Sequence, residues 1–182
     1  MIIGITGTNG AGKGTVVDYL VKQKGFAHYS AREFILEEVQ RRGMSPTRDS
    51  TNPVANELRQ KFGPAYVIEQ LLVRAKESGG NAVIESVRVI GEAEFLKSHG
   101  ALVWAVDADK QKRYERAVLR GSSTDKVSFE KFCEQEDREM AQTAAHDMNI
   151  KGVMVMADKV FYNNGKQEEL FVQVEEALKK SR

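Results

Sequence analysis

Nine residues near the start of the chain combine glycine, lysine and threonine at a spacing that could hold a chain of phosphates. They are Gly7-Thr8-Asn9-Gly10-Ala11-Gly12-Lys13-Gly14-Thr15. The backbone N–H groups of such a loop can surround a phosphate, and glycine allows the close approach and the positive φ angles that this requires. A lysine adds a mobile positive charge for the outer phosphate oxygens. The segment therefore predicts a binding site for a nucleoside triphosphate.

Within this loop, each residue type predicts a contact. We expect Lys13 to reach the β- and γ-phosphates of ATP, and the backbone around it to enclose the phosphates: Asn9, Gly10, Ala11, Gly12 and Gly14. Gly14 stands where a serine or threonine commonly follows the lysine and binds Mg²⁺. We therefore interpret Thr15 as a contact to the α- or β-phosphate and keep its hydroxyl as an alternative metal ligand. Phosphates and water would then hold most of the Mg²⁺ coordination.

An apolar segment precedes the loop and a helical pattern follows it, and the same alternation continues along the chain. The expected strands are Met1–Thr6, Phe26–Ser30, Asn81–Glu85, Ala101–Asp107 and Lys159–Asn163. The expected helices cover 13–24, 31–42, 53–77 with a break near Gly63-Pro64, 91–98, 109–120, 127–150 and 166–180. This order predicts an α/β fold whose five-stranded parallel sheet is covered by helices on both faces. We interpret the polar segment 43–53, which has two of the three prolines, as a loop.

Polar residues fall at the predicted carboxyl ends of the strands, where parallel sheets bind ligands. They are Gly7, Ser30, Glu85, Asp107 and Asn163. His28, in contrast, has no serine or aspartate partner at the spacing of a catalytic triad, and we interpret it as structural or exposed.

Length and composition restrict the other possibilities. With 182 residues, the chain is expected to form one domain. Its net charge of +1, from 27 basic and 26 acidic residues, gives no indication of a duplex nucleic acid or an anionic membrane as partner. The single cysteine excludes an intramolecular disulfide, and the first apolar segment is too short for a signal peptide or membrane span. We expect a cytoplasmic protein that acts on a small molecule, and its oligomeric state stays open.

Three segments carry a resemblance to known kinases. The motif Gly-x-x-Gly-x-Gly-Lys-Gly-Thr resembles the loop of adenylate kinase and related nucleoside monophosphate kinases. Residues 55–64 resemble the Asn-Glu-Leu-Arg-x-x-x-Gly-Pro segment of archaeal nucleotide-kinase relatives, and residues 157–165 resemble the last turn of dephospho-coenzyme A kinases. The resemblance implies a three-layer α/β/α P-loop NTPase fold that uses ATP and Mg²⁺. It also implies an acceptor-binding insertion over about 30–77 and a short helical lid over about 116–140.

The resemblance also implies roles at the end of the third strand. There the related kinases carry an acidic residue and, a few residues later, an arginine; Glu85 and Arg88 occupy these places. Glu85 would orient Mg²⁺ through water, and Arg88 would hold the phosphate of the acceptor. Arg32 and Arg59 are further candidates for that phosphate, and the sequence leaves open which of them contributes.

Arginines recur in the helix after the fourth strand. Arg113, Arg116 and Arg120 lie on one face of it, and the last two fit the Gln-x-x-x-x-Arg-x-x-x-Arg spacing of dephospho-coenzyme A kinase. In the related kinases such a helix leads into a lid whose arginines neutralise charge on the transferred phosphoryl group. The catalytic set implied is Lys13, Arg88, Arg116 and Arg120, with Arg138 as a further lid arginine. In the last turn, Asn163 and Gly165 would lie against the adenine, although both residue types also simply form turns.

Three functions follow, of which the first is preferred. It is transfer of phosphate from ATP to a nucleoside or deoxynucleoside monophosphate. The second is dephospho-coenzyme A kinase-like transfer to a ribose hydroxyl, which needs a base, and Glu85 is the candidate. Against it, the acidic signature expected after the second strand is absent, and residues 28–32 read His-Tyr-Ser-Ala-Arg. The third is an ATP-binding switch or assembly factor with weak ATPase activity.

Overall fold

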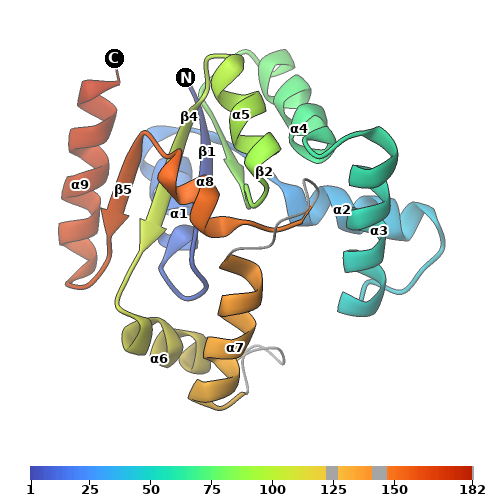
Figure 1. The fold of residues 1–182 in the computed structure, drawn as a ribbon. Coiled ribbons are helices and arrows are strands. Elements are labelled where there is room, and N and C mark those ends of the chain that lie inside the picture. The colour runs from blue at the N-terminus through green and yellow to red at the C-terminus, as the bar shows by residue number, and fades with distance from the viewer. Residues whose placement is uncertain (122–126, 141–146, 182) are drawn as a thin grey trace.

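The computed structural model describes residues 1–121, 127–140 and 147–181, and for residues 48, 49, 138 and 139 it describes the backbone alone. Across these residues, no helix combines the length and the apolar character that a membrane-crossing segment requires. Strands and helices alternate along the chain in the order that the sequence predicts (Figure 1).

Five parallel strands form the central sheet, as predicted. They are β1 (Ile2–Gly7), β2 (Ala27–Ser30), β3 (Ala82–Glu85), β4 (Leu102–Asp107) and β5 (Lys159–Tyr162). Their order across the sheet is β2-β3-β1-β4-β5, so the strand before the glycine-rich loop is central. The helices are α1 (Lys13–Lys24), α2 (Ala31–Arg41), α3 (Arg48–Phe62), α4 (Tyr66–Glu77), α5 (Ile90–Ser98), α6 (Lys110–Arg120), α7 (Phe129–Met140), α8 (Ile150–Val155) and α9 (Gln167–Lys180).

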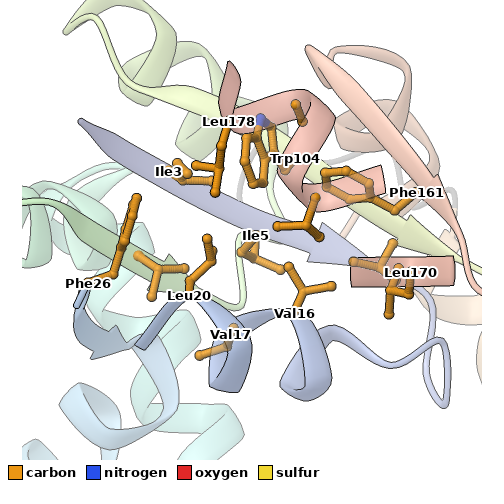
Figure 2. Packing of buried hydrophobic residues seen from close by; sticks show 14 of the residues in the cluster. Ile3, Ile5, Val16, Val17, Leu20, Phe26, Trp104, Phe161, Leu170 and Leu178 are labelled. Carbon is orange, nitrogen blue, oxygen red and sulfur yellow. The ribbon is translucent and has the colours of Figure 1, made fainter. Parts of the chain in front are cut away.

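One face of the sheet packs against α1 and α9. Alternate residues of β1, Ile3 and Ile5, are fully buried between these helices and the neighbouring strands, as Figure 2 shows. Trp104 of β4 and Phe161 of β5 meet edge to face, with ring centroids 5.1 Å apart. Burial of such large apolar side chains contributes about 1.5–3 kcal/mol each. This layer fixes the start of α1, and with it the loop that precedes the helix.

The opposite face packs against α4, α5 and α8. Its core includes Ile84 of β3 and Val103 of β4 with Ile68, Leu72 and Leu96 of the helices. The two apolar faces complete the three-layer α/β/α architecture, and the alternation of side chains along each strand explains it.

The carboxyl ends of the strands meet at one edge. Glu85 pairs in register with Ile5 of β1 and with Ser30 of β2. Asp107, at the end of β4, pairs with Tyr162 of β5. In Figure 1 the strands run towards α6 and α7, which lie beyond this edge. The loops after β1, β3, β4 and β5 therefore surround one region.

Two sequence predictions about helices are wrong. The segment 43–53 is not all loop, because α3 begins at Arg48, and Pro53 lies inside it. A hydroxyl causes this early start, since Ser50 Oγ accepts from the Thr47 N–H at 3.0 Å and satisfies a free donor at the helix start. A single helix over 127–150 is also wrong, because residues 147–149 are not helical. Asn149 instead begins α8 by accepting from the Gly152 N–H at 2.8 Å.

Candidate active site

The glycine-rich loop between β1 and α1 is closely packed from outside. Gly10 (φ 76°) and Gly12 (φ 100°) have the left-handed conformation that side chains disfavour. A Cβ on Gly10 would lie 2.2 Å from the Arg113 carbonyl oxygen, and one on Gly12 would lie 2.3 Å from Asn163 Nδ2. Both glycines are therefore needed for conformation and for space, and the loop is held in one shape by α6 and by the turn after β5.

Lys13 is the first residue of α1, and its side chain turns back over the loop. Its Nζ donates to the carbonyl oxygens of Gly7, at 2.9 Å, and Thr8, at 2.8 Å. The helix start carries no acidic residue in its first turn, so the positive end of the helix dipole is not neutralised there. Thr15 is half-buried in the same turn, and Gly14 is exposed. The ammonium group and the helix start therefore place positive charge together at the loop.

The turn after β5 lies directly on the loop. Asn163 is 8% exposed, and its Nδ2 donates to the Ala11 carbonyl at 2.8 Å. Its backbone N–H donates to the backbone carbonyl oxygen of Asp107 at 2.8 Å, which ties the turn to β4. Gly165 is exposed two residues later. Asn163 is therefore a structural support of the loop, whatever else it contacts.

The arginines of α6 face the same region. Asp109 begins this helix by accepting from the N–H groups of Gln111 and Lys112. Arg116 Nη2 then donates to the Asn163 carbonyl at 2.9 Å, and Arg120 Nη2 donates to Asn9 Oδ1 at 3.2 Å. Within the described parts of the chain, Nη1 of Arg116 is buried without a hydrogen-bond partner. A buried donor of this kind is costly unless a ligand satisfies it.

Arg113 has a different environment from the other two arginines. It is 4% exposed, and its Nη2 donates to Glu136 of α7 at 3.0 Å, with a second ion-pair contact between Nη1 and the same carboxylate. Burial acts to raise the pKa of Glu136, but Arg113 and Lys110 outweigh it, so the pKa is lowered. The pair joins α6 to α7. The side chain of Arg138 lies outside the described residues, as do residues 122–126 of the predicted lid.

Glu85 lies at the end of β3, beside β1. Its Oε2 is 3.1 Å from Nε2 of His28 on β2. This hydrogen bond lowers the pKa of Glu85 against the opposing effect of desolvation, and the charges of Lys13 and Arg88 lower it further. The same bond raises the pKa of His28. The fold therefore brings Glu85 within the electrostatic field of both predicted phosphate-binding side chains.

Arg88 is exposed, but its backbone is held from two sides. Its N–H donates to Glu92 Oε2 at 2.8 Å, and its carbonyl accepts from the Asn149 N–H at 2.9 Å. Its Nη1 contacts Met148 Sδ at 3.6 Å. Nearby, Ser86 has φ 76°, a conformation unusual for a residue with a side chain. This loop is therefore a constrained structure.

The two other acceptor-side candidates differ in exposure. Ser30 begins α2 by accepting from the Glu33 N–H at 3.3 Å, which leaves Arg32 exposed in the first turn, at the sheet edge. Arg59 is 7% exposed and pairs with Glu92, which is completely buried. The guanidinium of Arg59 thus faces a carboxylate inside the fold.

From the sequence we interpret His28 as structural or exposed, and the sequence gives no site role to Glu92 or Met148, yet all three contact predicted site residues. Glu92 stands three residues after Val89, the place of an acidic residue in a capping box, but valine is not the usual first residue of that motif. His28 lies on the strand next to Glu85, and only the strand order, β2 beside β3, joins them.

The residues present fit ATP. The glycines form a cradle that side chains would fill, and Lys13 and the start of α1 supply positive charge. Among the residues that the structure describes, Arg116 Nη1 has no hydrogen-bond partner, and this arginine lies beside the Asn163 turn. A β1–loop–α1 unit of this geometry binds phosphate through backbone N–H groups.

Comparison with known proteins agrees with this geometry. The family described as an AAA domain, AAA_18, matches residues 3–143. UPF0200 protein TK1334 of Thermococcus kodakarensis is 31% identical over 185 residues, which cover 98% of this chain and 96% of the relative.

Two solved structures share the fold. TT1252 of Thermus thermophilus has a TM-score of 0.62 at 19% identity, and the match covers 99% of this chain and 97% of TT1252. Shikimate kinase of Acinetobacter baumannii, in complex with shikimate, has a TM-score of 0.61 at 16% identity, and the match covers 99% of this chain and 93% of the kinase. The chain therefore shares the fold of these structures, and it belongs to the AAA domain family AAA_18 and to the UPF0200 family.

Proposed function

We propose that this protein transfers the γ-phosphoryl group of ATP to a small phosphate-bearing acceptor, a nucleoside or deoxynucleoside monophosphate. One observation carries the proposal. Glu85 is the last residue of β3, the loop that leads to Lys13 follows the neighbouring parallel strand β1, and the charges of Lys13 and Arg88 both act on Glu85. A donor site and an acceptor phosphate held by Arg88 would then be adjacent, as in-line transfer requires.

On the donor side, ATP would lie on the loop from Asn9 to Thr15. Lys13 would exchange its two carbonyl contacts for oxygens of the β- and γ-phosphates. Arg116 and Arg120 would stabilise the charge of the transferred group from α6, and Asn163 and Gly165 would border the adenine. Mg²⁺ would neutralise charge on the phosphates, with Glu85 holding one of its waters and Thr15 as an alternative ligand.

On the acceptor side, Arg88 would hold the phosphate, with Arg32 beside it at the sheet edge. An oxygen of the acceptor phosphate attacks the γ-phosphorus while the bond from that phosphorus to the β,γ-bridging oxygen breaks, and ADP leaves. Because a phosphate anion needs no deprotonation, the reaction requires no strong base. The lowered pKa of Glu85 favours this acceptor over a ribose hydroxyl, since it makes Glu85 a weaker base. We include residues 30–77 as the acceptor-binding insertion and 116–140 as the lid, in one domain.

The test is ADP formation from ATP and Mg²⁺ with a panel of acceptors. The panel contains nucleoside and deoxynucleoside monophosphates, dephospho-coenzyme A and shikimate. We expect one class of monophosphate to raise ADP formation well above the rate without acceptor, and Arg88→Met to lower kcat and to raise the KM for that acceptor. Stimulation by dephospho-coenzyme A or shikimate alone would replace the proposal by transfer to a hydroxyl. A slow rate that no acceptor changes would favour an ATP-binding switch with weak ATPase activity.

A further inference from the structure

Arg59 and Glu92 form an ion pair between two helices that belong to different parts of the fold. Arg59 lies on α3, between β2 and β3, and Glu92 lies in the first turn of α5, after β3. Arg59 is 7% exposed and Glu92 is fully buried. Burying a carboxylate is unfavourable unless a positive charge and hydrogen bonds compensate it.

The two oxygens of the Glu92 carboxylate have separate partners. Oε1 accepts from Nε and Nη2 of Arg59, at 3.3 and 3.1 Å. Oε2 accepts from the backbone N–H groups of Arg88, at 2.8 Å, and Val89, at 3.1 Å. The carboxylate is thus a bridge between the guanidinium of α3 and the backbone of Arg88.

The surrounding packing brings the same segments together. Gly91 lies against Pro64, at the turn between α3 and α4, and a Cβ on Gly91 would be 3.2 Å from the proline ring. The carbonyl of Arg88 accepts from the Asn149 N–H, so the residue is held from its other side as well. The guanidinium of Arg88 is exposed, but the backbone that carries it is fixed by hydrogen bonds on both sides.

We propose that Arg59 is a positioning residue that acts through Glu92 to hold Arg88, and that it does not contact the acceptor itself. The proposal rests on the proposed function for the role of Arg88, whereas the contact between Arg59, Glu92 and the Arg88 backbone can be tested without any acceptor. The role of the pair is then geometric: a neutral residue at position 59 leaves the Glu92 carboxylate without its positive partner, and the carboxylate then no longer holds the backbone of residues 88 and 89.

The first measurement is amide hydrogen exchange at Arg88 and Val89 by NMR, with the full chain and without acceptor. Arg59→Met and Glu92→Met should each accelerate exchange at both amides about tenfold, as expected when a hydrogen bond to a charged group is lost. Arg59→Lys keeps the charge but not the two-pronged geometry, and should restore part of the protection. Glu57→Gln is the matched control, because Glu57 also lies on α3 and pairs with Arg42 at the surface; it should leave exchange unchanged.

The second measurement is kinetic and uses the acceptor that the panel identifies. A displaced Arg88 should lower kcat about 10²-fold in Arg59→Met, since small misplacements near a transferred group have effects of this size. Because Arg59 acts only through Glu92, adding Arg59→Met to Glu92→Met should change kcat by less than about twofold. The double variant removes both charges of this buried pair, so it keeps the test available if Arg59→Met alone does not fold.

The outcomes separate the two proposals. Unchanged exchange at residues 88 and 89 in Arg59→Met, with a higher KM for the acceptor in the double variant than in Glu92→Met, would make Arg59 an acceptor ligand and overturn the positioning role. If no acceptor stimulates ADP formation, the proposed function fails, and faster exchange in Arg59→Met with recovery in Arg59→Lys still supports the pair. Unchanged exchange in that case overturns it.

Discussion

The loops after β1 and β3 follow neighbouring strands and end at the same sheet edge, but different forces shape them. The loop after β1 is built from glycines with positive φ, and its packing contacts are made mainly by backbone. The loop after β3 also has a positive φ, but at Ser86, and a buried carboxylate holds its backbone. A loop shaped by backbone leaves a readable pattern of glycines, whereas one shaped by distant side chains does not.

Charge follows the same division. In the β1 loop, Lys13 donates to two carbonyl oxygens of its own loop, those of Gly7 and Thr8. In the β3 loop, Glu85 and Arg88 depend on His28 and Glu92, and through Glu92 on Arg59. The glycines and the lysine of the first loop are therefore readable from its own segment, although α6 and the turn after β5 pack against it, and the second loop depends on how α3, β2 and α5 are assembled.

The largest expected effect is the loss of stability when the buried Arg59–Glu92 pair beside the β3 loop is broken. Arg59→Met should lower the free energy of unfolding by about 3–5 kcal/mol, because it leaves a buried carboxylate without its partner. Urea unfolding measures the change. Arg42→Met removes partly exposed ion pairs with Glu38 and Glu57 at the same group of helices, and it should cost less than about 1 kcal/mol. Equal effects of the two variants would mean that Glu92 is not truly buried in solution.

The next effect belongs to the β1 loop and concerns activity. Lys13→Ala should lower kcat by about 10²–10³-fold, the usual result of removing one group that stabilises transition-state charge. Lys22→Ala, on the exposed part of the same helix, should retain the wild-type rate. Steady-state kinetics with the acceptor decide this, and a Lys13→Ala enzyme with normal kcat would remove the loop from the donor site.

Two glycines of the β1 loop provide an internal comparison of stability. Gly12→Ala should destabilise the fold by at least about 1–2 kcal/mol, because alanine resists a positive φ and its Cβ would meet Asn163. Gly14→Ala has open space and a helical position, so it should be neutral or stabilising by up to about 1 kcal/mol. Thermal or urea unfolding of both variants gives the comparison, and equal losses would contradict it.

The smallest effect is the pH dependence of the His28–Glu85 contact. Because the folded pKa of His28 is raised, its stabilisation is complete below the unfolded value of 6.5 and is lost as pH rises through the folded pKa. Because the folded pKa of Glu85 is lowered, its contribution is present above 4.5 and lost as pH falls through the folded pKa.

The advantage of the wild type over His28→Asn should therefore be greatest between pH 4.5 and 6.5 and disappear at higher pH. Both side chains are partly exposed, so its size should stay below about 1 kcal/mol. Unfolding curves at several pH values test this, and Glu85→Gln should remove the same dependence. A difference that is independent of pH would mean that the two groups do not interact in solution.

Much of the architecture was available from local pattern. The five strands, the break before α4 and the position of the glycine-rich loop follow from apolar alternation and from glycine and proline positions, which act within a few residues. The errors have local causes too: Ser50 starts α3 within a segment rich in turn-forming residues, and Asn149 starts a separate helix inside a helical pattern. Such hydroxyl and amide caps compete with the periodicity on which the helix predictions relied.

The candidate site divides in the same way. That Lys13, Glu85 and Arg88 come together at one edge of the sheet could be predicted, because each lies at or after the end of a strand and strand ends converge in a parallel sheet. The environment of Arg59 could not, since nothing within its own segment distinguishes a phosphate ligand from a buried ion pair. Only its contact with Glu92, 33 residues away, makes that distinction.

By itself, the sequence determined a parallel α/β fold with a phosphate-binding loop, because conformational preferences of the backbone are properties of neighbouring residues. The tertiary structure alone decided which arginines face the site and which are paired inside the fold. A guanidinium takes its role from the nearest carboxylate or phosphate, and Coulomb and desolvation energies depend on distance in space and on burial, not on position along the chain.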